Sequence, residues 1–158
     1  MLARMRQSAK TENDGGFTLI ELLVVMIIIG ILAAIAIPVF LSQRAKAQDA
    51  ATKADVAKVG KELATYFVDN TAAPNSVAIS GGRYTLTATS GGTAQDLGKV
   101  STNVTAPAAG LAFYSSTAAL VPTMWCVNLT NSLGSTQTWK YSAKNGLQSG
   151  ACTSGTDY

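Results

Sequence analysis

The sequence predicts an α+β protein in which one long N-terminal α-helix packs on a small antiparallel β-sheet. Residues 17–41 are apolar apart from one acid, Glu21. Residues 42–70 carry frequent charges, and their apolar residues recur at helical spacing. After Pro74 the pattern changes to short alternating segments separated by glycines, which is typical of strands and turns. These three observations predict a helix in two halves followed by a β-sheet domain.

The composition argues against an enzyme. The chain of 158 residues contains no histidine, which removes the commonest general base and metal ligand. The sequence also offers no nucleophile–base set, no Cys/His metal spacing and no phosphate-binding loop, so we expect no cofactor and no metal site. The net charge of +3 comes without a sustained basic run in the C-terminal half, so the monomer sequence does not indicate nucleic-acid binding.

The apolar segment 17–41 is long enough to cross a membrane. A helix of this length rises about 1.5 Å per residue and exceeds the roughly 30 Å hydrocarbon core. The basic side chains of residues 1–16 favour a cytoplasmic N-terminus, so the rest of the chain would face outward. A plain membrane anchor explains the length. A secretory signal peptide, with Ala45-Lys46-Ala47 as its cleavage site, is a second interpretation, although its apolar region would be shorter.

A third interpretation accounts for the motif at the start of this segment. The run Gly16-Phe17-Thr18-Leu19-Ile20-Glu21 resembles the processing motif of type IV pilins and type II secretion pseudopilins. The resemblance covers roughly residues 15–60, and Gly30 and Pro38 also match the family pattern. It implies that a prepilin peptidase removes the leader 1–16 by cutting between Gly16 and Phe17, and that the new amino group of Phe17 is methylated.

Glu21 is the residue that most needs an explanation. With a helix beginning at Phe17, the carboxylate would lie near the first turn, where the helix dipole favours a negative charge. A charge in hydrocarbon still requires a partner, and no other charge follows before Arg44. The resemblance implies that Glu21 pairs with the Phe17 ammonium of a neighbouring copy during assembly. A general base or proton relay is the rival role, and it lacks a nearby His, Lys or second acid.

Two residues weaken the apolar helix. Pro38 removes a backbone donor and its ring clashes with the carbonyl of Ala34, while Gly30 lowers helix propensity. We expect a kink or a locally unwound stretch over residues 30–38. The resemblance implies that this stretch loses helical structure in a filament.

Residues 42–70 are expected to continue the helix as an amphipathic segment. The apolar stripe would pack on the soluble domain, and Asn70, Ala73 and Pro74 would end a single helix over residues 17–69. The stripe consists of Val56, Val59, Leu63, Tyr66 and Phe67.

Residues 71–158 are expected to form the β-sheet domain. A hairpin is predicted across Gly81-Gly82, and the remaining strand candidates are less sharply bounded. The predicted strands are 76–80, 83–89, 111–114, 125–130 and 138–142.

Cys126 and Cys152 would form a disulfide if this part is exported, and two buried free thiols are the alternative. The bond would contribute roughly 3 kcal/mol on the chain-entropy model. The family often has such a disulfide-bounded loop at its C-terminal end. Secretion pseudopilins carry a calcium site there, which the scarcity of acids after Asp96 makes unfavourable.

Three functions remain open, of which the resemblance implies the first two. The first is the major pilin of a type IV pilus, which passes from a single-span cytoplasmic membrane form to an extracellular filament serving adhesion, motility or DNA uptake. The second is a pseudopilin of a type II secretion or competence system. For both, the resemblance implies as partners copies of the chain itself, prepilin peptidase, a membrane platform protein and an assembly ATPase. The third is a membrane-anchored binding or enzymatic domain, and the absence of histidine weighs against it.

Overall fold

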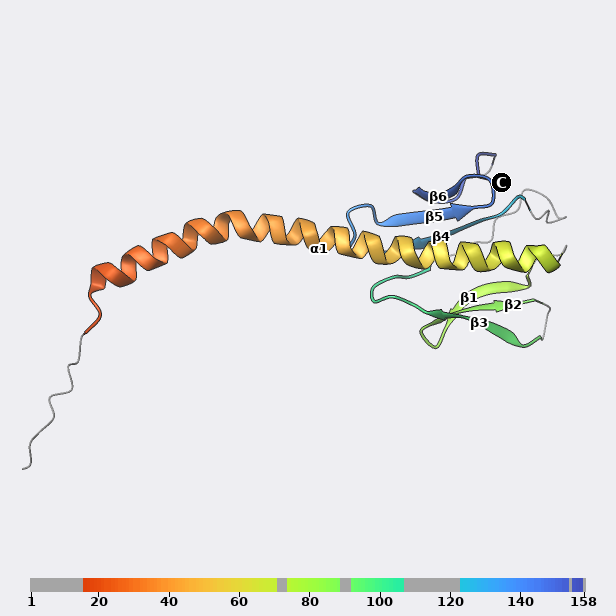
Figure 1. Cartoon of the computed structure of the whole chain (residues 1–158), viewed down its shortest axis with the longest axis horizontal. Coiled ribbons are helices and arrows are strands. Elements are labelled where there is room, and N and C mark those ends of the chain that lie inside the picture. Colours follow the sequence, from red (N-terminus) through yellow and green to blue (C-terminus); the bar gives the residue numbers. More distant parts are fainter. Residues whose placement is uncertain (1–15, 71–73, 89–91, 107–122, 154, 158) are drawn as a thin grey trace, which may run out of the picture. The chain divides into compact units, whose positions relative to one another are not determined.

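One helix, α1 (Leu19–Asp69), accounts for the N-terminal part of the protein (Figure 1). The chain divides into two compact units, residues 1–39 and 40–158, and α1 passes through both. The predicted single helix is confirmed except at its start, because Phe17 and Thr18 precede the first helical residue. The computed structural model describes residues 16–70, 74–88, 92–106, 123–153 and 155–157.

The second half of α1 carries the predicted apolar stripe. Val56, Val59, Leu63 and Phe67 are buried in the core, and the partly buried Tyr66 packs against the same cluster. The helix ends where Asn70 donates to the Tyr66 carbonyl through both its backbone N–H, at 3.1 Å, and its side-chain amide, at 2.9 Å. The stripe therefore packs into the hydrophobic core, as the sequence predicts.

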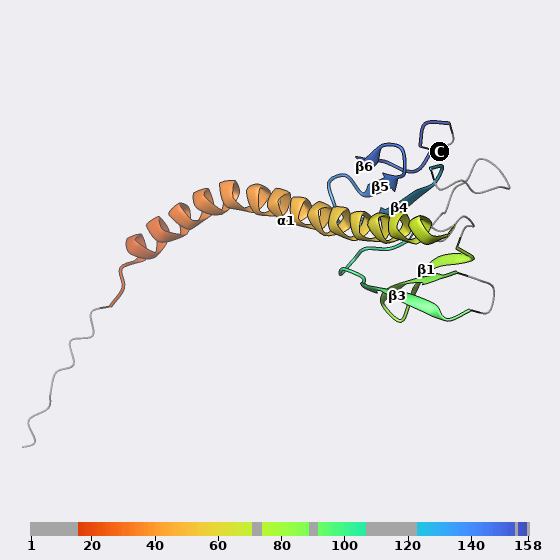
Figure 2. The ribbon, with the colours of Figure 1, turned by 45° about the vertical axis from the view of Figure 1, so that its right-hand side comes forward.

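Within the described residues, the strands form two three-stranded antiparallel sheets, where the sequence analysis expected one. The first sheet follows chain order and contains β1 (Ser76–Ser80), β2 (Arg83–Thr87) and β3 (Ala94–Lys99). The second sheet also follows chain order and contains β4 (Cys126–Thr130), β5 (Thr138–Ser142) and β6 (Gly146–Ser149). Figures 1 and 2 show the two sheets on either side of the second half of α1.

The predicted hairpin joins β1 to β2. Ser80 pairs with Arg83 across Gly81 and Gly82, whose φ angles are 56° and 73°. Two consecutive residues at positive φ are what a tight two-residue turn needs, and glycine adopts this conformation without a steric penalty.

The other strand predictions were accurate where the chain alternates clearly. β5 has the predicted bounds, β4 begins one residue later than expected, and β2 ends at Thr87. β3 and β6 were missed, and the candidate strand 111–114 lies outside the described residues.

A single hydrophobic core joins α1 to both sheets. Thr105 and Thr130 also exchange backbone hydrogen bonds of 2.8 and 2.9 Å, which tie the segment after β3 to the end of β4. The buried apolar residues are Val56, Val59, Leu63, Phe67, Val77, Tyr84, Leu86, Leu97, Val104, Trp125, Val127 and Leu129.

Two buried carboxylates on α1 bind one sheet each. Asp55 accepts hydrogen bonds of 2.8 Å from the Tyr84 hydroxyl, on β2, and from the Ser101 backbone N–H, two residues after β3. Asp49 accepts the Thr136 backbone N–H at 3.0 Å, in the loop that joins β4 to β5. Burial, and then the hydrogen bond to Asp55, raise the pKa of Tyr84 above its usual value. Buried polar groups need hydrogen-bond partners, and these two find theirs on β2 and in the loops beside the sheets.

Candidate assembly site

The first turn of α1 is closed by a reciprocal pair of side chains, Thr18 and Glu21. The Glu21 carboxylate accepts the Thr18 backbone N–H at 2.9 Å and the Thr18 hydroxyl at 2.7 Å. In return, the Glu21 backbone N–H donates to the Thr18 hydroxyl at 3.3 Å. The Thr18 carbonyl accepts the N–H of Leu22, also at 3.3 Å, so Thr18 is the N-cap residue. This arrangement is a capping box.

The capping box revises the account of Glu21. The sequence analysis placed the start of the helix at Phe17. As partners for the Glu21 carboxylate it considered only charged groups. In the structure α1 begins at Leu19 instead. Thr18 supplies two uncharged hydrogen-bond donors to the carboxylate, its backbone N–H and its hydroxyl. The signal was present in the sequence, because Thr-x-x-Glu before an apolar run marks a helix start. Both hydrogen bonds from Thr18 reach the same oxygen of the Glu21 carboxylate, Oε2.

The predicted cleavage bond lies immediately before this turn. Gly16 and Phe17 adopt no helical or strand structure, and the Phe17 side chain is 82% exposed. The bond that joins them is therefore outside the helical ladder. A cut there would leave an ammonium one residue before the Thr18 cap, at the same end of the helix as the Glu21 carboxylate. The cut and the methylation of Phe17 stay predictions.

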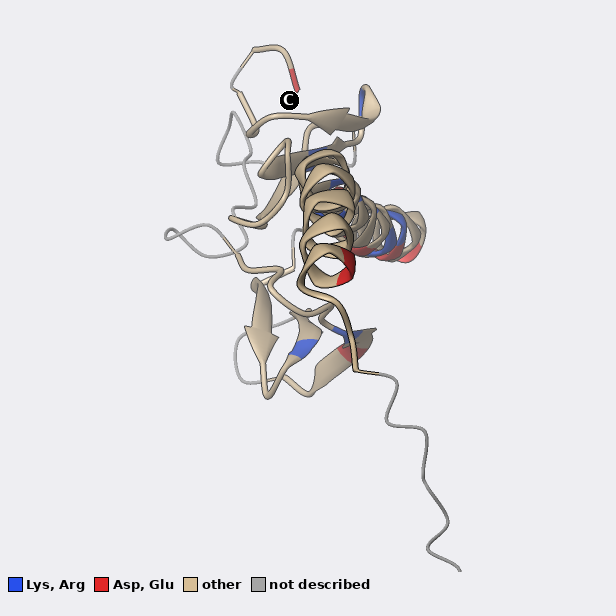
Figure 3. Ribbon diagram, turned by 90° about the vertical axis from the view of Figure 1, so that its left-hand side faces the viewer, with Lys and Arg blue, Asp and Glu red and all other residues tan. Residues whose placement is uncertain are grey.

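The apolar half of α1 exposes its side chains around the whole helix. Residues 17–41 carry one charge, that of Glu21, and Figure 3 shows an acidic position at the start of α1. Among the described residues, α1 is the helix whose length and composition would suit a membrane span. A helix that is apolar on every side is stable only in lipid or when covered by protein. α1 remains helical through Gly30 and Pro38, so unwinding there stays a prediction about an assembled state.

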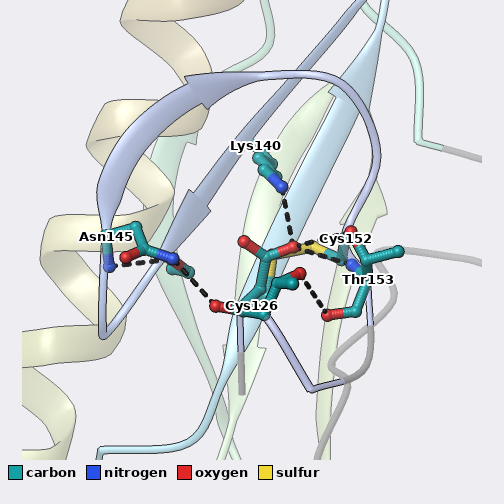
Figure 4. Close-up of polar contacts among 8 residues, drawn as sticks. Cys126, Lys140, Asn145, Cys152 and Thr153 are labelled. Carbon is teal, nitrogen blue, oxygen red and sulfur yellow. Dashed lines mark hydrogen bonds and ion pairs between the residues drawn. A yellow bond between two sulfur atoms is a disulfide. The ribbon is translucent and has the colours of Figure 1, made fainter.

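The C-terminal loop is closed by the predicted disulfide. Cys126, the first residue of β4, is bonded to Cys152 with their Cα atoms 5.9 Å apart (Figure 4). The expected disulfide is thus confirmed, and the alternative of two free thiols is excluded. A Cα separation of this size is ordinary for a protein disulfide.

A buried ion pair lies beside the disulfide (Figure 4). The Lys140 ammonium is 2.7 Å from the carboxylate of Asp157, which is 1% exposed. The same oxygen accepts the backbone N–H of Thr153 at 2.7 Å and its hydroxyl at 3.1 Å. Burial acts to raise the pKa of Asp157, but the hydrogen bonds from Lys140 and Thr153 outweigh it and lower that pKa. The sequence analysis did not identify this pair, because the two residues are 17 positions apart.

Comparisons with known proteins find one family profile and several relatives that match part of the chain. A family profile described as "Prokaryotic N-terminal methylation motif" matches residues 13–37. Type II secretion system core protein G of Pseudomonas aeruginosa is 41% identical over 65 residues, which are 41% of this chain and 46% of that protein. No solved structure matches the chain significantly.

Two relatives are named as pilus proteins. Type IV major pilin protein PilA of Myxococcus xanthus is 41% identical over 63 residues, which are 40% of this chain and 29% of that protein. Type IV wide pilus major component PilA4 of Thermus thermophilus is 46% identical over 59 residues, which are 37% of this chain and 45% of that protein. The matches therefore span less than half the length of these curated relatives.

Proposed function

Because this chain belongs to the type IV pilin and pseudopilin family, we propose that it is the major structural subunit of a type IV pilus. The members of this family are structural subunits, not enzymes. In the proposed role the subunit is anchored by α1 in the cytoplasmic membrane and then assembles into an extracellular filament for adhesion, motility or DNA uptake.

The observation that carries the proposal is the exposed apolar half of α1 with one carboxylate fixed at its start. Large apolar side chains along this half are about half exposed or more, so their burial must come from lipid or from other molecules. Lipid covers them before assembly, and the helices of neighbouring copies cover them afterwards. In the membrane and in the filament alike, Glu21 lies in the first turn of α1. The ammonium of Phe17 that cleavage would free lies at that same end of the helix.

Processing and assembly require partners. The motif at Gly16-Phe17 would be cut and methylated by a prepilin peptidase, and extraction from the membrane would need a platform protein and an ATPase. Glu21 would orient each incoming subunit by binding the Phe17 ammonium of its neighbour. Its capping bonds to Thr18 keep the carboxylate at the N-terminal turn, which limits the loss of side-chain entropy when that ion pair forms.

A pseudopilin of a type II secretion or competence system is the second candidate. The similarity to core protein G supports it directly. The C-terminal loop favours the pilus, because Asp157 is the sole acid after Asp96 in the sequence and its carboxylate binds Lys140. A calcium site of the kind expected in secretion pseudopilins would lack its acidic ligands here.

The decisive experiment separates the charge of Glu21 from its role in the cap. Glu21→Gln removes the charge but keeps a side chain that suits the capping box, whereas Thr18→Val removes the cap and keeps the charge. Expressed with the assembly machinery, the wild type should yield sheared surface filaments whose N-terminal residue is methylated Phe17. Glu21→Gln should insert in the membrane normally and yield few or no filaments.

Different results of this experiment would refute different parts of the proposal. Normal filaments from Glu21→Gln together with none from Thr18→Val would assign Glu21 to the cap alone and refute its role as an assembly charge. A mature chain that starts after Ala47 would refute the whole proposal in favour of a signal peptide. Processed chains that dominate sheared filaments indicate a major pilin, whereas processed chains confined to the cell envelope indicate a pseudopilin.

A further inference from the structure

The loop between β4 and β5, residues 131–137, presents one large apolar side chain at the surface. Its sequence, Asn-Ser-Leu-Gly-Ser-Thr-Gln, is otherwise polar or glycine, and Leu133 is 50% exposed. Leu133 lines a groove in the second unit together with Leu41, Arg44 and Ala45 of α1. An isolated exposed leucine is ordinary, but this one adjoins another exposed leucine, Leu41.

The position of this loop is fixed by α1. The Asn131 side-chain amide donates to the Gln48 side chain at 3.0 Å, and the Thr136 backbone N–H donates to Asp49. Gly134 packs so closely on Asp49 that a Cβ atom there would overlap the carboxylate. Leu133 is therefore held beside one stretch of the helix.

That stretch is where the apolar segment of α1 ends. Leu41, Arg44, Ala45 and Gln48 recur at spacings of three and four, so they share one face of the helix. Leu41 is the last residue of the apolar run, and Arg44 is the first charge after it. In a spanning helix, residues at this transition lie where hydrocarbon gives way to lipid headgroups.

We propose that the 131–137 loop binds the surface of the lipid bilayer that α1 spans, before the subunit enters a filament. Leu133 enters the interfacial layer next to Leu41, which removes both side chains from water. The Arg44 guanidinium binds lipid phosphate beside them, since a guanidinium forms strong charge-assisted hydrogen bonds with phosphate oxygens. The inference rests on the proposed membrane anchorage of α1. It commits to lipid, and a second copy of the chain is the rival occupant.

Photo-crosslinking of the full precursor tests the proposal. The photoreactive residue p-benzoylphenylalanine replaces Leu133 in one variant and Leu147 in a matched control. Leu147 is also exposed, at 41%, but lies on β6 and not on this groove. Both variants are reconstituted in vesicles of phosphatidylglycerol and phosphatidylethanolamine and irradiated. Mobility on a non-reducing gel verifies that each retains the Cys126–Cys152 bond.

Position 133 should give phospholipid adducts, detected by mass spectrometry, at a level several-fold above position 147. Arg44→Gln should lower the share of phosphatidylglycerol among those adducts. Equal lipid adducts at both positions, or adducts at 133 formed with a second copy of the chain, would overturn the inference. Anchorage is scored separately by resistance to alkaline extraction. Loss of anchorage would refute the membrane form in the proposed function, whereas an anchored chain without lipid adducts at 133 would refute this inference alone.

Discussion

Lys140 of β5 and Asp157, which lies five residues after Cys152, form a buried ion pair of 2.7 Å. The carboxylate also accepts two hydrogen bonds from Thr153, which follows Cys152 directly. The covalent bond and the ion pair therefore hold the same short segment against β4 and β5. This relationship leads to two predictions about the stability of the C-terminal loop.

The first prediction concerns loss of the ion pair. Lys140→Met leaves the buried carboxylate of Asp157 without its cation and should lower the free energy of unfolding by about 3 kcal/mol. Stability should also depend on acid. Because the pKa of Asp157 is lowered in the folded protein, its contribution is present above the unfolded pKa of about 4 and is lost as the pH falls through the folded pKa. Urea unfolding of the full chain in detergent, followed by tryptophan fluorescence from pH 6 down to about pH 2, measures both effects.

Two variants control this measurement. Asp157→Asn should flatten the acid dependence, because the titrating group is gone. Arg83→Gln breaks the 2.7 Å hydrogen bond to Asp96, a pair that is about half exposed, and should change stability far less. If Lys140→Met and Arg83→Gln lowered the free energy of unfolding equally, burial would not be what makes the Lys140–Asp157 pair matter more for stability.

The second prediction is that the disulfide and the ion pair are coupled. Replacing both Cys126 and Cys152 with serine should cost roughly 3 kcal/mol on the chain-entropy model. In that background Lys140→Met should cost less than in the wild type, because the 153–157 segment is no longer held in place. A double-mutant cycle from urea unfolding measures the coupling. Strictly additive losses would show that the two features stabilise the loop independently.

The third prediction concerns Tyr84 at alkaline pH. Burial and the hydrogen bond to Asp55 raise its pKa, so the folded protein keeps the phenol neutral where the unfolded chain ionises it. The resulting stability is present below the unfolded pKa of about 10 and declines as the pH rises beyond it. Tyr84→Phe should reduce this alkaline decline while costing about 1–2 kcal/mol at neutral pH through the lost hydrogen bond. Urea unfolding between pH 8 and about pH 11 tests this, and an unchanged slope in the variant would contradict it.

The parts of the fold that were predicted are those with a local signal. The long helix follows from apolar length and spacing, and the first hairpin follows from Gly81-Gly82. β3 was missed because it has one buried apolar residue, Leu97, and a register shift opposite Tyr84 and Thr85. β6 has no buried residue and forms because β5 offers an edge to pair with.

The polar contacts of the core were not predictable from spacing. Asp49 and Asp55 look like solvent-facing charges in an amphipathic helix, yet their partners come from loops distant in sequence. Such burial is set by tertiary contacts. The Thr18–Glu21 cap is different, since its signal is four residues long and needs no tertiary information.

The last prediction concerns Gly60, where α1 packs closely on Tyr141 of β5. A Cβ atom at Gly60 would overlap the ring of Tyr141, which cannot move freely because it stacks on Trp125 with ring centroids 6.0 Å apart. Gly60→Ala should therefore lower the free energy of unfolding by about 1–3 kcal/mol, despite the better helix propensity of alanine.

Gly30→Ala is the matched control in the same helix, because a Cβ there meets nothing within 4 Å. That variant should leave the isolated subunit as stable as the wild type or slightly more so. In a Tyr141→Ala background the overlap with the ring disappears and only the contact with the Cβ atom of residue 141, at 2.8 Å, remains, so Gly60→Ala should cost clearly less in urea unfolding. A loss of the same size in both backgrounds would show that Gly60 is required for some reason other than its approach to Tyr141.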